Sequence, residues 1–380
     1  MMWLLGFAPL VAWLYLLFGR GMFWMTRERD AGDVAPLEAW PSVVAVVPAR
    51  DEADVIERTV GSLMRQEYQG DFKVILIDDQ SGDGTGDAVR TLAGAATTAG
   101  GRGCTVIDGA ARPPGWTGKL WAVKQGVAAA GAPDYLWLTD ADIAHTPNNL
   151  SKLVARAESG GLVLTSLMAK LRCGNAAERL LIPAFVFFFD MLYPFAWVND
   201  PRNKLAAAAG GCMLVGRAAL EKAGGIDAIR SEIIDDCALA RLMKAHGPIW
   251  LGLTDRSASL RPYGFSDIRK MVARSAYAQL SYSPLLLLGT VIGMVLVYLA
   301  APIAAIFARS LPEYAGIAAW AMMVAAFAPM LRFYRLSPVI GLALPVIGLI
   351  YTWFTLDSAV QHWRGRGGMW KGRAQAAGQA

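Results

Sequence analysis

Charged residues are scarce in this sequence. They make up 18% of its 380 residues, whereas 55% are hydrophobic, and the mean hydropathy is +0.36. A soluble protein of this length rarely has so apolar a composition, so we expect association with a membrane. The abundance of apolar side chains also excludes a mainly disordered chain, because it is ample for a core.

Cysteine and histidine are also few. The four cysteines have no CxxC spacing, and the three histidines are far apart in the sequence. Neither a disulfide framework nor a zinc site is indicated, and a reducing cytosolic location is allowed. The sequence has no GxGxxG motif, which disfavours a dinucleotide site. The net charge of +5 is modest, and no basic run is interleaved with aromatics inside the folded part, so nucleic acid is not an expected partner.

Long apolar runs lie near both ends of the chain. Residues 2–18 carry no charge and are just long enough to span a bilayer. They lack the basic n-region and the small-residue cleavage site of a secretory signal peptide. We therefore expect residues 1–20 to form a retained N-terminal membrane anchor. A C-terminal transmembrane region is predicted over 284–358, with spans at about 285–308, 314–331 and 336–356.

Basic residues near the apolar runs predict the orientation of the chain. Arg20, Arg27 and Arg29 follow the first run, and the positive-inside rule places such residues in the cytoplasm. We therefore expect a multi-pass protein of a bacterial-type plasma membrane, with the domain that follows the first run facing the cytoplasm. The basic tail, 359–380, would lie outside after one plus three spans although its charges favour the inside, and both placements stay open.

Between the apolar regions, after a linker at 21–41, charges become frequent. Helical patterns alternate there with β-branched runs at 42–49, 73–79, 104–109 and 134–142. This alternation predicts an α/β domain over 42–264, with a mostly parallel sheet and helices on both faces.

Three local segments give further expectations. The Gly/Ala-rich stretch 93–103 predicts a surface loop. The apolar run 184–198 predicts a buried helix or an element dipping into the membrane. Residues 265–283 predict an interfacial helix or an ordinary amphipathic one.

Acidic residues gather where the predicted strands end, which is the edge at which open α/β sheets bind ligands. Asp140 and Asp142 are one residue apart, and on an extended segment both would point to one side. Two such carboxylates suit Mg²⁺ or Mn²⁺, which would link them to a diphosphate. The alternative is a solvated turn. Asp78 and Asp79 could bind a base or ribose. Alternatively, the motif is an Asx-turn with helix capping, which suits Ser81, Asp83 and Thr85.

Three further segments carry candidate site residues. Residues 48–52 begin at the end of the first strand, where they would line the same cleft or cap a helix. Lys119 lies at a predicted helix start, where it would attract phosphate or be an ordinary surface lysine. Glu232, Asp235 and Asp236 begin another predicted helix. One of them could be a general base, or all could simply complement the helix dipole.

The motifs PARDEADVI, IDDQSGDGT, TDAD, GGCMLVGRAAL and IIDDCALARLMK occur in this order along residues 42–255. Together they resemble the inverting glycosyltransferases of family 2, which have the GT-A fold. The GWTGKLWA block and the C-terminal apolar region are similar to those of the hopene-associated glycosyltransferases and their carotenoid-glycosylating relatives.

The resemblance implies a role for each matching residue. The base and ribose of a nucleotide sugar, expected to be a UDP-sugar, would be held by Pro48, Ala49, Arg50, Glu52 and Asp79. Asp140 would touch the ribose or diphosphate, and Asp142, with Asp140, would ligate the divalent cation. Lys119 would contact donor phosphate, and Asp236 would be the catalytic base. Asp235 stands where the family usually has Glu.

The acceptor is the open part of this hypothesis. Processive family members carry a (Gln/Arg)xxArgTrp motif after the base, whereas MVARS at 271–275 keeps only Arg274 of it, which weakens the case for a polysaccharide synthase. We expect hexosyl transfer to a membrane lipid, such as a hopanoid or another isoprenoid alcohol. The alternatives are a polyprenyl-phosphate glycosyltransferase and a sugar-nucleotide-binding membrane protein without catalysis. A transporter is disfavoured, because the apolar runs hold almost no ionisable residues.

Overall fold

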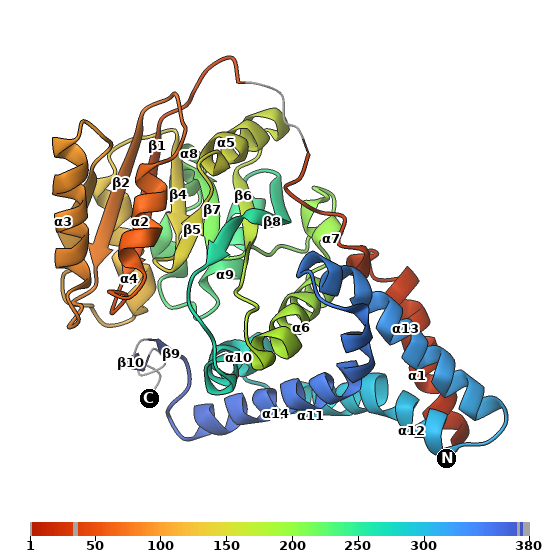
Figure 1. Cartoon of the computed structure of the whole chain (residues 1–380). Helices are drawn as coiled ribbons and strands as arrows, with labels where there is room; N and C mark the ends of the chain where they lie inside the picture. Colours follow the sequence, from red (N-terminus) through yellow and green to blue (C-terminus); the bar gives the residue numbers. More distant parts are fainter. Residues whose placement is uncertain (1, 33–36, 371–372, 375–380) are drawn as a thin grey trace. The chain divides into compact units, whose positions relative to one another are not determined.

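The chain forms two compact units in the computed structural model, which describes residues 2–32, 37–370 and 373–374 (Figure 1). The first unit comprises residues 1–27, 173–196 and 262–369, and the second comprises residues 28–172, 197–261 and 370–380. Residues 33–36 of the predicted linker, and residues 371–372 and 375–380 of the predicted tail, lie outside the described residues.

An eight-stranded sheet in the order β3-β2-β1-β4-β7-β6-β8-β5 forms the centre of the second unit. β1 runs parallel to β2 and β4, and β6 runs parallel to β8, whereas β7 is antiparallel to both β4 and β6. The carboxyl ends of β1, β2, β4 and β8 therefore lie at one edge. The strands are β1 (Val43–Ala49), β2 (Phe72–Asp78), β3 (Cys104–Asp108), β4 (Tyr135–Thr139), β5 (Ile143–His145), β6 (Leu164–Lys170), β7 (Cys212–Gly216) and β8 (Ile249–Ser259).

Helices cover both faces of this sheet. All seven residues of β1 are buried, and Val43 and Val47 join a core that includes α2, α3 and α5 side chains. On the other face, α4 lies so close that a Cβ at Gly126 would be 2.4 Å from Val46 Cγ1. The prediction of an α/β domain is confirmed. The helices are α2 (Ile56–Met64), α3 (Thr85–Thr98), α4 (Gly118–Ala129), α5 (Asn149–Gly160), α7 (Phe195–Asn199), α8 (Arg217–Lys222), the 3₁₀ helix η2 (Ile226–Ile229) and α9 (Asp235–Lys244).

Two local predictions are wrong. β4 ends at Thr139, so Asp140 and Asp142 lie in a turn and not on an extended strand. The Ile143 N–H donates to the Asp140 carbonyl at 3.2 Å, and the chain then pairs with β8 through β5. The loop expected at 93–103 begins later, because α3 continues to Thr98. Alanine, which is frequent in that stretch, is the residue that most favours helix.

The start of the linker is fixed to the sheet. Arg29 forms a parallel bridge with Leu253 of β8, whose N–H donates to the Glu28 carbonyl at 2.9 Å. The side chain of Asp30 is only 3% exposed, with one carboxylate oxygen 2.6 Å from Arg256 Nη1 and the other 3.7 Å from Arg156 Nη2. The residues that follow the first unit's N-terminal segment therefore belong to the sheet domain.

Helices make up the first unit. Three helical stretches, Pro284–Phe307, Leu311–Phe333 and Pro338–Trp363, are long and apolar enough to cross a membrane, as predicted. α1 (Met2–Phe18) is a shorter apolar helix. The other elements are the 3₁₀ helix η1 (Phe23–Met25), α6 (Ala176–Leu192), α10 (Phe265–Gln279), α11 (Pro284–Met294), the π-helix η3 (Val295–Leu299), α12 (Ala300–Phe307), α13 (Leu311–Phe333), the 3₁₀ helix η4 (Pro338–Ala343) and α14 (Leu344–Trp363). Near the unit boundary, the short strands β9 (Met369–Trp370) and β10 (Arg373–Ala374) pair with each other.

Within the first unit, α6 is a buried helix, and it accounts for most of the apolar run at 184–198. Its Phe187 ring lies 5.1 Å from that of Phe327 in α13, and its Phe188 ring lies 4.9 Å from that of Tyr351 in α14. α1 approaches α13 closely, since a Cβ at Gly6 would be 2.6 Å from the Pro312 carbonyl oxygen.

Candidate active site

Lys119 joins acids from two other elements at the carboxyl edge of the sheet. It is the second residue of α4, whose N-cap Thr117 accepts a hydrogen bond from the Leu120 N–H. Lys119 Nζ lies 2.9 Å from Asp140 Oδ1, just after β4, and 3.0 Å from Asp235 Oδ2, at the first residue of α9. The structure thus brings Lys119 and Asp140 together, as members of one ion cluster.

Asp236 lies beside this cluster and is held by backbone donors. Its Oδ2 accepts a hydrogen bond from the Gly210 N–H at 3.0 Å, and its Oδ1 accepts one from the Cys237 N–H at 2.7 Å. Glycine permits the approach, since a Cβ at Gly210 would lie 3.2 Å from Lys119 Nζ. Both carboxylate oxygens of Asp236 are therefore oriented by main-chain groups.

Burial and neighbouring charges shift the pKa values of the cluster. Burial raises the pKa of Asp236 to about 6, and the charge of Asp235 adds to the rise, while Lys119 opposes it. Burial also raises the pKa of Asp140, against the effect of Lys119 and together with that of Asp142. Burial alone would lower the pKa of Lys119, but Asp140 and Asp235 outweigh it and hold that pKa above its ordinary value.

Mostly apolar walls surround a small pocket beside the cluster. Lys119, Thr139, Asp140 and Asp235 contribute its polar side chains, and Pro48, near the end of β1, also lines it. Asp140 is exposed to these apolar surroundings, which disfavour its charged carboxylate. The apolar lining includes Leu120, Val123, Leu138, Met213, Ile226 and Leu239.

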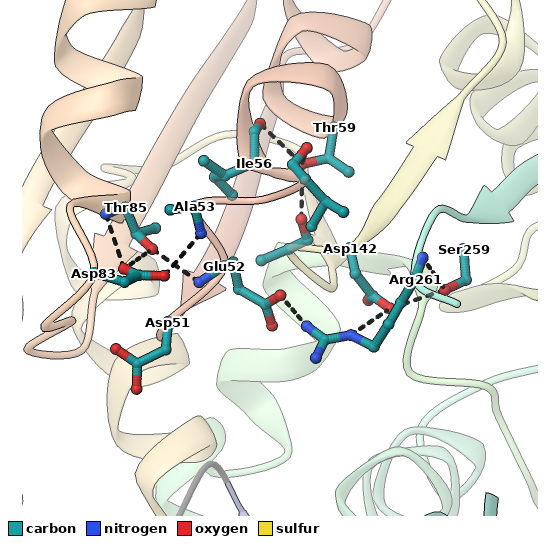
Figure 2. Close-up of polar contacts among 12 residues, drawn as sticks. Asp51, Glu52, Ala53, Ile56, Thr59, Asp83, Thr85, Asp142, Ser259 and Arg261 are labelled. Carbon is teal, nitrogen blue, oxygen red and sulfur yellow. Dashed lines mark hydrogen bonds and ion pairs between the residues drawn. The ribbon is translucent and has the colours of Figure 1, made fainter. Parts of the chain in front are cut away.

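A second ion cluster holds Asp142 and Glu52 (Figure 2). The Arg261 guanidinium pairs with the Glu52 carboxylate, and its Nε lies 3.7 Å from Asp142 Oδ2. The Ser259 hydroxyl donates to the same Asp142 oxygen at 2.9 Å. Because Lys119 neighbours Asp140 and Arg261 neighbours Asp142, each acid of the TDAD motif lies beside a cation of the protein.

The ends of β1 and β2 are joined by Arg50 and Asp79. Asp79 is fully buried, its N–H donates to the Ala49 carbonyl at 2.8 Å, and its Oδ2 lies 3.7 Å from Arg50 Nη1. Arg50 Nη1 also donates to the carbonyl oxygens of Asp79 and Gln80. These residues form the part of the edge to which the sequence assigned the base and ribose of a nucleotide.

The expected Asx-type turns are present at this edge, but the expected side-chain capping is not, since the N-caps of α2 and α3 are Val55 and Gly84, which make no side-chain cap. Asp83 accepts hydrogen bonds from the N–H groups of Thr85 at 3.0 Å and Ala53 at 2.9 Å, and the Glu52 N–H donates to Thr85 Oγ1 at 2.8 Å (Figure 2). Asp78 accepts from the Ser81 N–H at 3.0 Å. The Gly-rich turn therefore fixes the backbone from which Glu52 and Asp79 project.

Arg261 and Ser259 were not predicted from the sequence. Ser259 is the last residue of β8, and Arg261 follows it by two residues. β8 runs parallel to β6, and β6 and β4 are both antiparallel to β7, so β8 and β4 end at the same edge of the sheet. The strand-end rule that singled out Asp140 would have found them, had the direction of this eleven-residue strand been known. Local sequence around Arg261 carries no other signal.

The residues at Asp140 and Asp142 suit a divalent cation that binds together with a substrate. Among the described residues, no group of three or more His, Cys, Asp or Glu side chains is arranged to hold a metal ion. Mg²⁺ needs no such group, since it is commonly held by one or two carboxylates, with water and substrate phosphates completing its oxygen ligands. The mutual repulsion of the two carboxylates, seen in the effect of Asp142 on the pKa of Asp140, would be relieved by such an ion.

The fold and the site are those of an open α/β sheet with an acidic, Lys-bridged cluster at its carboxyl edge. Residues 44–224 match the model of glycosyl transferase family 2. The chain thus carries a family 2 glycosyltransferase domain, and the prediction of a glycosyltransferase is confirmed. No curated protein matches the chain.

Two solved structures are similar to this chain to different degrees. The mannosyltransferase PcManGT from Pyrobaculum calidifontis, in complex with GDP-Man and Mn²⁺, is similar with a TM-score of 0.55 and 20% identity, over 96% of this chain and 99% of that chain. The glucosyl-3-phosphoglycerate synthase from Mycobacterium tuberculosis has a TM-score of 0.42 and 19% identity, over 63% of this chain and 79% of that chain. The likeness to PcManGT shows a GT-A-like architecture.

Proposed function

We propose that this protein is a membrane-bound inverting glycosyltransferase that moves a hexose from a nucleotide sugar to a lipid alcohol. The observation that carries the proposal is the Lys119-bridged cluster of Asp140 and Asp235, with Asp236 beside it on two backbone N–H groups. A carboxylate with a pKa of about 6 is ionised at neutral pH and still basic enough to accept a proton in a transition state.

The donor would bind along the edge from β1 to β4. Arg50 and Asp79, with Pro48, Ala49 and Glu52, would hold the base and ribose, and we expect a UDP-sugar. The PcManGT complex contains GDP-Man, so GDP-mannose is the second donor to test. Asp140 would face the ribose or diphosphate.

Proton transfer would be the task of Asp236. Its carboxylate takes the proton of the acceptor hydroxyl while that oxygen attacks the anomeric carbon, and the bond from this carbon to the diphosphate oxygen breaks. One displacement inverts the anomeric configuration, so no sugar–enzyme bond forms. Asp142 and Asp140 would hold a divalent cation, Mg²⁺ or Mn²⁺, which supplies positive charge for the leaving diphosphate. Lys119 and Arg261 would add fixed positive charge at the same edge.

The acceptor is proposed to be a membrane lipid. Three stretches of 24, 23 and 26 residues in the same chain are apolar enough to cross a membrane, and a lipid alcohol would reach the enzyme from there. The similarity of the GWTGKLWA block to hopene-associated glycosyltransferases favours a hopanoid or another isoprenoid alcohol. The protein would lie in the plasma membrane with the sheet domain in the cytoplasm, where sugar nucleotides are made, and α10 would lie on the membrane surface.

A transfer assay with purified protein in detergent tests this function. Radiolabelled UDP-glucose or GDP-mannose, with Mn²⁺, is supplied with a hopanoid alcohol in one arm and polyprenyl phosphate in the other. We expect labelled, alkali-stable lipid in the alcohol arm only. Transfer to polyprenyl phosphate alone would show that the acceptor is a lipid phosphate and not an alcohol. Donor binding without transfer in either arm would show that the protein binds the sugar nucleotide but does not catalyse.

A further inference from the structure

His145 lies at the centre of a buried polar network next to the site. Its Nε2 is 2.9 Å from Thr139 Oγ1, and its Nδ1 is 2.9 Å from Ser257 Oγ and 3.2 Å from Asn149 Nδ2. None of these four residues is more than 6% exposed. They come from β5, β4, β8 and the start of α5, so one imidazole connects four elements.

The hydrogen bonds of this network fix the positions of their protons. Thr139 Oγ1 lies 2.8 Å from the Gly211 carbonyl oxygen, which can only accept, so the single hydroxyl proton is donated there. Thr139 Oγ1 must then accept from His145, which places a proton on Nε2. With its Nδ2 group toward the ring, Asn149 donates to Nδ1, which then accepts and carries no proton. The imidazole is neutral, in agreement with burial, which lowers the pKa of His145 to about 3.

The Thr139 and Ser257 branches of the network end next to the site carboxylates or the residues that hold them, whereas the Asn149 branch leads to the start of α5. Thr139 directly precedes Asp140 in the chain. Gly211, its second partner, directly follows Gly210, whose N–H binds Asp236. Ser257 is two residues before Ser259, whose hydroxyl binds Asp142, and both lie in β8.

A role in packing alone would not account for this arrangement. The His145 ring does contact the Trp137 ring, with centroids 4.6 Å apart, as a core side chain would. However, packing needs no ordered set of donors and acceptors such as the imidazole, Thr139 and Ser257 make. Asn149 Oδ1 has no partner among the described residues, so the ordered part of the network is the one that leads through Thr139 and Ser257. It leads to the turn that carries Asp140 and Asp142, and to two segments that bind site carboxylates through Gly210 and Ser259.

We propose that His145 is a positioning residue for sugar transfer. As a neutral Nε2–H imidazole it would hold the Asp140–Asp142 turn, the Gly210–Gly211 segment and the end of β8 in register. The inference rests on the proposed function of the site, and it assigns His145 no contact with substrate.

Thr139 offers the sharpest substitution, because Thr139→Val replaces the hydroxyl by a methyl group of similar size. Displacing a reacting group by a fraction of an ångström has large kinetic effects, so we expect kcat to fall roughly 10- to 100-fold. Thr139→Ser keeps the hydroxyl and should stay within about threefold of the wild type. The matched control is Thr165→Val in the same sheet, since Thr165 is fully buried and its Oγ1 has no hydrogen-bond partner in the part of the chain that the structure describes.

The kinetic outcome separates positioning from folding. Thermal unfolding and circular dichroism give the folded fraction, and kcat and KM are compared per folded molecule. If Thr139→Val behaves like Thr165→Val in both constants, the proposal is wrong. Ser257→Ala tests the second branch, and it decides the question by the same criterion if Thr139→Val does not fold.

A spectrum tests the tautomer without any reference to activity. The chain has three histidines, so ¹⁵N-histidine labelling gives few signals, and His246→Gln and His362→Gln assign the other two. We expect the neutral Nε2–H pattern for His145 in the wild type and its loss in Thr139→Val. A protonated Nδ1 would overturn the proposal. Failure of the wild type to transfer sugar would instead refute the proposed function, and the affinities of the variants for UDP-glucose and GDP-mannose would then replace kcat in the comparison.

Discussion

At the scale of single residues, the site contains more carboxylates than cationic side chains. Lys119 contacts Asp140 and Asp235, while among the described residues Asp236 receives hydrogen bonds from the backbone N–H groups of Gly210 and Cys237. One lysine cannot neutralise three acids, so the remaining negative charge and the apolar surroundings keep the pKa of Asp236 raised. The same imbalance attracts cations and repels the diphosphate, which is why a divalent ion suits the site.

The pH dependence of kcat should report Asp236. Since the base must be ionised, kcat should fall as the pH drops through about 6 and be level above it. Asp235→Asn removes a neighbouring negative charge that raises this pKa, so it should move the acidic limb to lower pH. The measurement is kcat against pH at saturating donor for both proteins. A limb that does not move would assign the titration to another group.

Lys119 should matter for stability far more than its neighbour in the same helix. Lys119→Met leaves three acids without their shared cation, and breaking a mostly buried ion pair costs about 3 kcal/mol. Lys124→Met removes an exposed pair with Asp227 and should cost under about 1 kcal/mol. Thermal unfolding of the two variants in detergent measures the difference, and equal melting temperatures would contradict the account.

Most of the acids at this edge could be predicted from the sequence, because each directly follows an apolar run that reads as a buried strand. Asp140 was found in this way, whereas Asp236 was found at the start of a predicted helix and through the family resemblance. Asp236 meets Asp140 because the Gly210 N–H, just before β7, binds it, and β7 pairs with β4. Arg261 could not be found, because its position depends on the direction of β8, which is set by pairing with a strand about 90 residues earlier. His145 was seen only as an isolated histidine, since none of its partners is within three residues.

At the scale of elements, the agreement is best where one physical signal dominates. Continuous β-branched runs gave β1 and β2 within a residue of their ends, because such runs favour strands buried on both faces. The predicted fourth strand was too long, since the turn at Asp140–Asp142 is imposed by the pairing of β5 with β8 and not by local sequence. The predicted helix ended too early at α3, because the glycines of 93–103 outweighed the surrounding alanines in the prediction.

The attachment of residues 28–30 to β8 should depend on Asp30. Asp30→Ala leaves Arg256 and Arg156 without their buried carboxylate and should destabilise the domain by about 3 kcal/mol. Hydrogen exchange should quicken at the Leu253 amide, which donates to Glu28. Asp255→Ala, on the same strand but with an exposed side chain, is the control. Unchanged exchange at Leu253 in Asp30→Ala would show that the backbone pairing is independent of the ion pair.

At the scale of the whole molecule, the chain passes repeatedly between its two units. The second unit contains every residue assigned to the donor and to the base, whereas the first contains the three stretches that could cross a membrane. The family 2 match ends at residue 224, before both Asp236 and Arg261. The part of the site that would act on the acceptor therefore lies outside the region that the family model describes.

Donor and divalent cation should stabilise the protein together. A ligand that binds only the folded state raises its stability, by about 2.7 kcal/mol at one hundred times Kd. We expect the melting temperature to rise with UDP-glucose or GDP-mannose plus Mn²⁺, and EDTA to abolish most of the rise. Asp142→Asn should remove the dependence on Mn²⁺. Full stabilisation by donor in EDTA would rule out the assigned metal role of Asp142.

The most direct test of the central claim is the turnover of Asp236→Asn under donor saturation. In the same detergent preparation, donor affinity and melting temperature establish that the variant is folded and binds the sugar nucleotide. The account predicts that transfer to the lipid acceptor falls by roughly 100- to 10,000-fold, because the acceptor hydroxyl loses its base. Near-normal turnover by a folded, donor-binding Asp236→Asn would contradict it.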